Sequence, residues 1–230
     1  MKKLIVITAL VPLIITAAVI QFLPEKVPMH YDIHDNADRY GSRYEMFILP
    51  LCLLIITAVF MMISHRFSVK GRNGESKQNA EARSNARVTD ILTLALSVML
   101  GVMQYFFLYR VMVNSGGSAA DAEFDSLKLS AVLLSVLLIV AGNIMPKTGS
   151  NHTVGLRIKW SLYNDTTWTK SNRFAGHVLT ASGVLSLLTS LLCKSGAAAT
   201  VMLLVYLTAA IVISSAFAKK VYDEETAKAQ

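Results

Sequence analysis

The sequence predicts an all-α fold: a polytopic membrane bundle of six transmembrane helices with both termini in the cytoplasm. Three observations lead to this fold class. The 230-residue chain is 53% hydrophobic and 16% charged, whereas soluble domains are about 45–50% apolar and about 25% charged. Its apolar residues form long blocks, and most of its Lys and Arg residues lie between alternate blocks. This composition argues against a disordered chain and against a soluble globular enzyme.

Six segments are long and apolar enough to cross a bilayer, which takes about 20 helical residues. Because lipid offers the backbone no hydrogen-bonding partner, each segment is expected to be a helix. The first block exceeds the apolar length typical of a signal peptide and has no small-residue cleavage site after it, so we expect a retained helix. The six segments span residues 4–23, 46–63, 91–113, 129–145, 174–193 and 197–217.

The distribution of basic residues predicts the orientation of the bundle. Of the 22 Lys and Arg residues, 16 lie at the N-terminus, after the second and fourth spans, and in the C-terminal tail. These segments share one side of a six-helix topology, and basic loops stay in the cytoplasm. The net charge of +7 is therefore mainly a topology signal, and no motif supports direct binding of nucleic acid.

The spans divide the chain into three parts. Residues 1–63 form an N-terminal two-helix unit with an extracellular loop at 24–45. Residues 64–90 form a basic cytoplasmic loop near anionic headgroups, in which residues 79–90 are expected to form a short juxtamembrane helix. Residues 91–230 form a four-helix unit with a cytoplasmic loop at 146–173.

The outer loop is expected to fold into a cap rather than to remain a loose tether. Pro24 and Pro28 hold its start in an extended path, and Asp35-Asn36 and Tyr40-Gly41-Ser42 supply turn chemistry. The loop holds five carboxylates and three basic residues, so it favours a cationic partner.

The same loop is rich in side chains that suit zinc or a similar ion. Their spacing matches no established ligand motif, and the turn residues argue against a helix that would place both histidines on one face. We therefore expect hydrogen-bonded loop structure here, with no metal and no cofactor. The side chains concerned are His30, Asp32, His34, Asp35 and Asp38.

The cytoplasmic loop holds both tryptophans of the chain, Trp160 and Trp168, each near Lys or Arg. An interfacial belt, in which Trp lies at headgroup depth, explains these residue types. It does not explain the density of Gly, Asn, Arg and Trp in one stretch, which exceeds what a connector needs.

Both loops resemble signatures of one known family. The outer loop contains Leu23-Pro24, Val27-Pro28, His30 and Asp38-Arg39-Tyr40-Gly41-Ser42-Arg43. The second region contains Gly142-Asn143-Ile144-Met145, Asn151, Gly155-Leu156-Arg157, Trp160-Ser161-Leu162, Trp168, Ser171-Asn172-Arg173 and Gly176. Together these patterns resemble the SdpI family of bacterial membrane immunity proteins, whose members carry an N-terminal domain of unknown function. The resemblance covers residues 23–43 and 142–176 and extends to their places among the spans.

The chain departs from the family pattern at three places. Arg43 replaces the usual Lys, Asp35 replaces a Gly near the first turn, and Ser171-Asn172 replaces a Thr-His pair. Losing this His weakens any acid–base role for the cytoplasmic loop and leaves a hydrogen-bonding or structural role intact.

The resemblance implies a multi-pass protein of the bacterial cell membrane that protects a cell against a secreted killing peptide. Besides the lipid bilayer, its expected partners are the toxin peptide and a cytoplasmic transcriptional repressor, which one branch of the family holds at the membrane. The residues expected to meet the peptide are Pro28, His30, Asp38, Arg39, Gly41 and Arg43. Those with a structural or signalling role are Asn143, Asn151, Gly155, Arg157, Trp160, Trp168, Arg173 and Gly176.

Two other function classes remain open. A small transporter or channel that exports a peptide or ion would need polar residues along the spans, where Gln104, Arg110, His177 and scattered Ser and Thr are the candidates. A membrane-embedded enzyme would need carboxylates or histidines at one depth, and the sequence has no such group within its spans. We therefore predict that the protein is not an enzyme.

Overall fold

The computed structural model describes residues 1–33, 36–72, 74, 76–115, 125–151 and 153–228. Six long helices and one small antiparallel sheet make up this part of the chain. The long helices are α1 (Lys2–Val19), α2 (Ile48–Lys70), α3 (Lys77–Ser115), α4 (Ser126–Ile144), α5 (Asp165–Leu192) and α6 (Gly196–Ala227). The sheet has two strands, β1 (Lys26–Tyr31) and β2 (Ala37–Ser42). The chain also forms three short 3-10 helices: η1 (Ile20–Phe22) before β1, η2 (Arg43–Phe47) after β2, and η3 (Met145–Lys147) after α4.

The structure confirms the all-α class, since each of the six helices is long and apolar enough to cross a membrane. The protein is therefore a multi-pass membrane protein. Four helices extend well beyond the predicted spans at the cytoplasmic end, because α2 continues to Lys70, α3 begins at Lys77, α5 begins at Asp165 and α6 continues to Ala227. Adding a residue to a formed helix is far easier than starting one, so the polar flanks continue the spans.

These extensions shorten the connections. The basic region expected at 64–90 is mostly helical: α2 continues to Lys70, and the stretch 79–90 is the start of α3 rather than a separate juxtamembrane helix. Of the outer connection after α3, residues 116–124 lie outside the described part of the chain.

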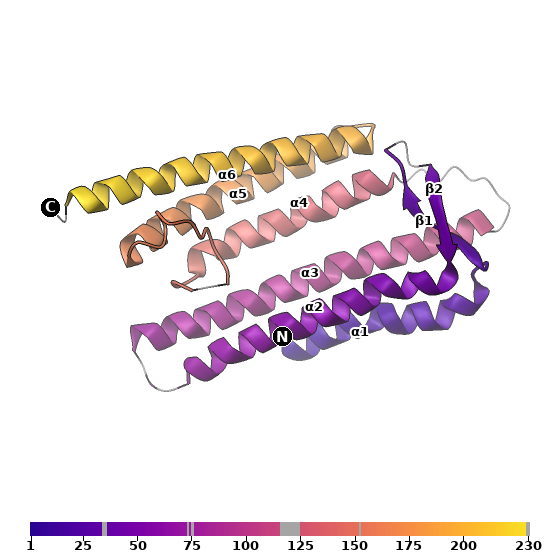
Figure 1. The fold of residues 1–230 in the computed structure, drawn as a ribbon, viewed down its shortest axis with the longest axis horizontal. Coiled ribbons are helices and arrows are strands. Elements are labelled where there is room, and N and C mark those ends of the chain that lie inside the picture. Colours follow the sequence, from indigo (N-terminus) through magenta and orange to yellow (C-terminus); the bar gives the residue numbers. More distant parts are fainter. Residues whose placement is uncertain (34–35, 73, 75, 116–124, 152, 229–230) are drawn as a thin grey trace.

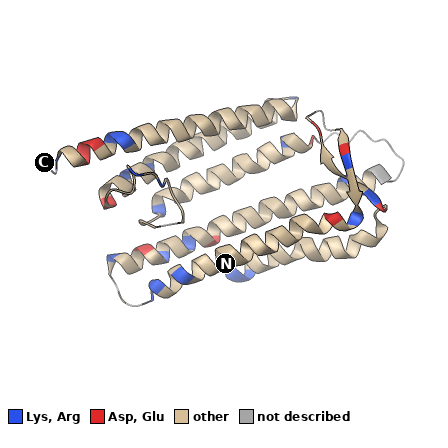
Figure 2. Cartoon of the chain, in the orientation of Figure 1, with Lys and Arg blue, Asp and Glu red and all other residues tan. Residues whose placement is uncertain are grey.

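The helices form two groups of three (Figure 1). α1, α2 and α3 pack together in one group and α4, α5 and α6 in the other, and α3 packs against α4 between them. α1 runs toward the hairpin and α6 runs away from it, so both termini point away from the hairpin end. Charged residues concentrate toward the two ends of the bundle, whereas the middle of the helices carries few (Figure 2). The end rich in Lys and Arg is the cytoplasmic end by the positive-inside rule.

Small residues let the helix backbones of the second group approach closely, as is common in membranes. A Cβ at Gly142 would lie 2.7 Å from the Gly176 carbonyl oxygen, and one at Gly176 would lie 2.6 Å from that of Gly142. Farther along the same contact, Ser135 donates to Ser186 with the two hydroxyl oxygens 2.8 Å apart. α4 and α5 therefore meet along a seam of Gly and Ser.

The outer cap is a two-stranded hairpin. β1 and β2 pair antiparallel, with Lys26 opposite Ser42 and Tyr31 opposite Ala37, and the register is irregular around His30. The expected folded cap is thus correct, but Tyr40-Gly41-Ser42 belongs to β2 and does not form the expected turn. A proline in β1 is tolerated because both strands of a two-stranded sheet are edges.

Candidate functional site

The hairpin brings most of the predicted outer residues into one small unit. Pro28 and His30 lie on β1, Asp38, Arg39 and Gly41 lie on β2, and Arg43 begins η2. The His30 ring Nδ1 lies 2.6 Å from Asp38 Oδ1 across the strands. Both side chains are exposed, so this pair contributes little to stability.

Glu45 organises the base of the hairpin. Its carboxylate accepts a hydrogen bond from the Ser42 backbone N–H at 3.0 Å and pairs with the Arg39 guanidinium at 2.7 Å. The carboxylate lies across Gly41, and a Cβ there would collide with it. Gly41, which we expected to contact a peptide, is therefore needed to make room for the Glu45 carboxylate.

Arg43 ties the hairpin to the end of the first span. Its Nη1 donates to the Leu23 carbonyl oxygen at 3.0 Å. Leu23 is buried in an apolar cluster with Val27, Leu108 and Val111. The cap is thus fixed to α3 as well as to α1 and is not a free tether.

A cavity of about 310 Å³ lies beneath the hairpin, between β1, η2, α2 and α3. Its walls are largely apolar, and Arg39 and Glu45 stand among its lining residues together with Gln104. This volume is at the lower end of the roughly 300–1,000 Å³ typical of ligand pockets. The other lining residues are Pro28, Met29, Tyr31, Met46, Ile48, Leu49 and Phe107.

Two buried polar side chains of α3 connect the elements around this cavity. Gln104 is 1% exposed, and its Nε2 donates to Thr16 Oγ1 at 2.9 Å and to the Met46 carbonyl oxygen at 3.1 Å. The Arg110 guanidinium lies 4.0 Å from the centre of the Tyr31 ring, a cation–π contact. Gln104 thus joins α1 and η2 to α3, and Arg110 joins α3 to β1.

The hairpin shows no metal centre in its described part. No group of three His, Cys, Asp or Glu side chains is placed to hold an ion anywhere in the described residues. His34 and Asp35 lie outside them, and Asp32 Oδ1 accepts from the Asn36 backbone N–H at 2.9 Å.

At the cytoplasmic end, the loop between η3 and α5 is built on buried hydrogen bonds. Asn151 uses its whole amide: Nδ2 donates to the carbonyls of Gly149 and Val154 at 2.8 and 2.9 Å. Its Oδ1 accepts from the N–H groups of Thr153 and Val154 at 2.7 Å each. One side chain therefore fixes the turn.

Gly155, Trp168 and Asn172 form the centre of this loop. Gly155 has φ = +124°, and a Cβ there would lie 2.5 Å from Asn172 Oδ1 and 2.9 Å from Trp168 Cη2. Trp168 is 2% exposed, and its Nε1 donates to the Thr148 carbonyl oxygen at 2.9 Å. Asn172 Oδ1 accepts from the Leu156 backbone N–H at 2.7 Å. Trp168 is thus a buried structural residue and not an anchor in an interfacial belt.

The loop is also tied to α3. Asn85 accepts a hydrogen bond from the Gly149 backbone N–H at 3.0 Å, and Ser84 donates to the Lys147 carbonyl oxygen. Lys77, in the cytoplasmic extension of α3, pairs with Asp165 at the start of α5. The hydrogen bond and the negative charge of Asp165 raise the pKa of Lys77 above its ordinary value.

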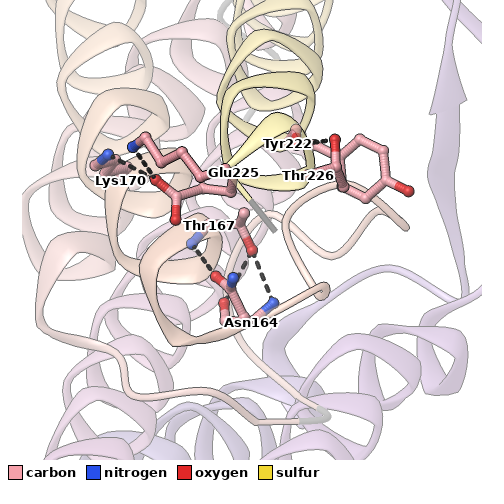
Figure 3. Close-up of polar contacts among 7 residues, drawn as sticks. Asn164, Thr167, Lys170, Tyr222, Glu225 and Thr226 are labelled. Atoms are coloured by element: carbon pink, nitrogen blue, oxygen red, sulfur yellow. Dashed lines mark hydrogen bonds and ion pairs between the residues drawn. The ribbon is translucent and has the colours of Figure 1, made fainter. Parts of the chain in front are cut away.

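The C-terminal extension of α6 packs beside the start of α5 (Figure 3). Asn164 and Thr167 cap α5 reciprocally, as each side chain accepts from the other's backbone N–H. Glu225 lies between Lys228 and Lys170, at 3.0 and 3.3 Å. Hydrogen bonds from these ammonium groups lower the pKa of Glu225, which lies beyond the apolar segment of α6.

Four of the predicted cytoplasmic residues stand apart from this packed centre. Trp160 is half-buried, with the Lys159 ammonium 5.4 Å from its ring centre. Asn143, Arg157 and Arg173 are exposed. They form no hydrogen bond through their side chains and no ion pair with any residue that the structure describes.

Two regions of the chain match known families. Residues 147–217, which include this loop, match the SdpI/YfhL protein family. Residues 7–54, which include the hairpin, match a domain of unknown function (DUF1648). Over 185 residues the chain is 28% identical to the immunity protein SdpI of Bacillus subtilis (strain 168). These residues make up 80% of this chain and 79% of the relative. The chain is thus similar to the SdpI/YfhL protein family over residues 147–217 and to the immunity protein SdpI over most of its length.

No solved structure matches this chain, so the relation between the two regions that match known families comes from the present structure. They lie at opposite ends of the bundle, the hairpin at the outer end and the SdpI/YfhL loop at the cytoplasmic end (Figure 1). Asn172, which stands where the family pattern has His, uses its amide in two buried hydrogen bonds. This is the structural role that the sequence left open.

Sequence reasoning missed several residues that hold the two sites of this protein. Ser42 followed by Glu45 is a capping box, a pattern that the sequence displays openly. Asn85 and Asp90 carried no such signal: both were placed in a solvated loop, yet they are 3% and 8% exposed. Asp90 accepts a hydrogen bond from Ser64 of α2 at 2.5 Å. Only the packing of α2 on α3 makes these positions interior.

Proposed function

We propose that this protein is an integral membrane immunity protein that protects its cell by binding a secreted peptide beneath the outer hairpin. Its similarity to the immunity protein SdpI supports the immunity function. The observation that carries the binding site is the cavity of about 310 Å³, since it has apolar walls and one ion pair at its side. Such a cavity suits an apolar side chain of a peptide whose neighbouring residues are polar or cationic.

The action proposed here is binding rather than catalysis. Glu45 and Gln104 already hold the hairpin and α1 in place. A bound peptide would contact elements that run through the membrane, because η2 leads directly into α2 and Gln104 belongs to α3. Binding energy could thus bias the position of α2 and α3, provided that the peptide prefers one arrangement.

The test is a matched pair of cavity variants in cells exposed to culture supernatant of a peptide-producing strain. Ile48 lines the cavity, so Ile48→Trp should fill it and lower the tolerated dose about tenfold. Ile55 lies two turns further along α2 and is 65% exposed, so Ile55→Trp should leave protection unchanged. Both variants are first checked for wild-type membrane levels.

Two results would contradict the peptide site. One is full protection by Ile48→Trp. The other is full protection by the double variant Pro28→Ala with Asp38→Ala, which alters the predicted contact surface on both strands of the hairpin. Flux measurements in proteoliposomes address the alternative of a transporter or channel, which predicts transport that Gln104→Leu abolishes.

We also propose that the cytoplasmic loop passes the presence of the peptide to a cytoplasmic partner such as a transcriptional repressor. Arg157 and Arg173 support this role, since both are exposed and neither side chain is used in the described fold. Arg157→Gln with Arg173→Gln should abolish peptide-dependent reporter expression and leave survival unchanged. Equal reporter induction in this variant and wild type would contradict the signalling role.

A further inference from the structure

A second cavity, of about 300 Å³, lies at the cytoplasmic end between α2, α3 and the turn that precedes Gly155. It is separate from the peptide site, which lies at the outer end. α2 contributes Arg66 and Lys70, α3 contributes Asn85, and the turn contributes Ser150 and Thr153.

The charge of this cavity is one-sided. Two cations and no carboxylate stand among the described residues that line it. Arg66 and Lys70 form no ion pair or side-chain hydrogen bond with any residue of the described ranges. The nearby Asp90 carboxylate is occupied by Ser64. The cavity is therefore suited to an anion with several acceptor oxygens.

Asn85 provides an independent observation. It is 3% exposed, and its Oδ1 accepts from the Gly149 backbone N–H. Its Nδ2 group donates to no other residue within the described chain and is not among the polar atoms that are buried without a partner, so it keeps some contact with solvent. Asn85 lines the cavity, so a ligand oxygen there would complete its hydrogen bonding.

The depth of the cavity indicates where such an anion comes from. The apolar segment of α2 ends at Ile63, and Ile63 and Phe67 line the cavity beside the two cations. Apolar and cationic groups thus meet at the level where the hydrocarbon gives way to headgroups. Basic pockets between helices on this side of a membrane bind phosphate headgroups.

We propose that this cavity binds a phosphate group, that of an anionic phospholipid headgroup in the cytoplasmic leaflet. Arg66 and Lys70 contact the phosphate oxygens and Asn85 donates its Nδ2 hydrogen. The headgroup then bridges α2 to the turn that Asn151 fixes, so the lipid becomes part of the cytoplasmic frame of the loop.

The experiment measures binding of phosphatidylglycerol, phosphatidylcholine and inorganic phosphate to the full-length protein in neutral detergent, by native mass spectrometry and thermal unfolding. We expect one tightly held phosphatidylglycerol, and binding about tenfold weaker in Arg66→Gln with Lys70→Gln. Arg87→Gln with Lys219→Gln is the matched control: it removes the same charge from exposed positions outside the cavity and should keep the bound lipid.

Asn85→Asp tests the site at a buried position and leaves the exposed cations Arg66 and Lys70 unchanged. The carboxylate keeps the acceptor for Gly149 N–H and repels a phosphate, so lipid binding should fall about tenfold while the fold is retained. Saturable binding of inorganic phosphate, with phosphatidylglycerol no better than phosphatidylcholine, would overturn the lipid as the source. Equal losses in the cavity and control doubles, or no effect of Asn85→Asp, would overturn the site.

Discussion

Replacing Gly155 by alanine tests the centre of the cytoplasmic loop most directly. At φ = +124° an L-residue is strained, at a cost of about 1–3 kcal/mol. The new Cβ would also overlap Asn172 Oδ1 and the Trp168 ring. Moving these groups breaks the hydrogen bond from the Leu156 N–H to Asn172 Oδ1 and the one from Trp168 Nε1 to the Thr148 carbonyl oxygen, each worth about 0.5–1.5 kcal/mol. We therefore expect Gly155→Ala to destabilise the protein by about 4 kcal/mol.

The assay is reversible unfolding in mixed micelles, followed by tryptophan fluorescence. Both tryptophans lie in or beside this loop, so the signal reports on the region that is changed. Gly101→Ala is the control, because a Cβ there meets only Pro12 Cγ at 3.3 Å and a carbonyl at 4.0 Å. It should change the unfolding free energy by less than about 1 kcal/mol. A Gly155→Ala protein as stable as the control would refute the argument from backbone strain and crowding.

Three further predictions address other contacts. Gly41→Ala should expel the Glu45 carboxylate from its cap and ion pair, destabilise the hairpin by about 1–2 kcal/mol, and speed amide exchange in β2 but not in α6. Gly142→Val should separate α4 from α5 and cost about 3 kcal/mol or more in the same unfolding assay; an unchanged midpoint would contradict the seam. Because the pKa of Glu225 is lowered in the folded protein, its pairing stabilises the fold at neutral pH, and this is lost as the pH falls through that lowered pKa. Lys228→Gln should raise the pKa of Glu225 toward its ordinary value in a carboxyl NMR titration, and no shift would exclude the pairing.

The sequence by itself determined the number of spans, their order and the cytoplasmic end of the bundle. This is possible because lipid satisfies no backbone group, so an apolar block of about 20 residues has one solution as a single segment. The 16 cytoplasmic bases then fix the orientation. Neither step requires knowledge of which helix contacts which. The two family signatures were visible for the same reason, since they lie in the polar loops between the blocks.

Helix pairing was decided only in the tertiary structure. Apolar spans gain nothing from hiding one face from lipid, so their sequences do not mark the contact side as a soluble helix would. Gly142 and Gly176 allow the close contact of α4 and α5. In the sequence, nothing distinguishes them from other glycines in a span.

The roles of the predicted site residues were also decided by packing. Gly41 is needed because Glu45 lies across it, and Gly155 because of its backbone angle and the Trp168 ring. Asn85 is interior because α3 is covered by α2 and by the cytoplasmic loop. The contact of Gly155 with Trp168 depends on a local backbone angle, and that of Asn85 with Gly149 joins segments far apart in the chain. Composition and spacing locate such residues, and only the folded backbone says what they touch.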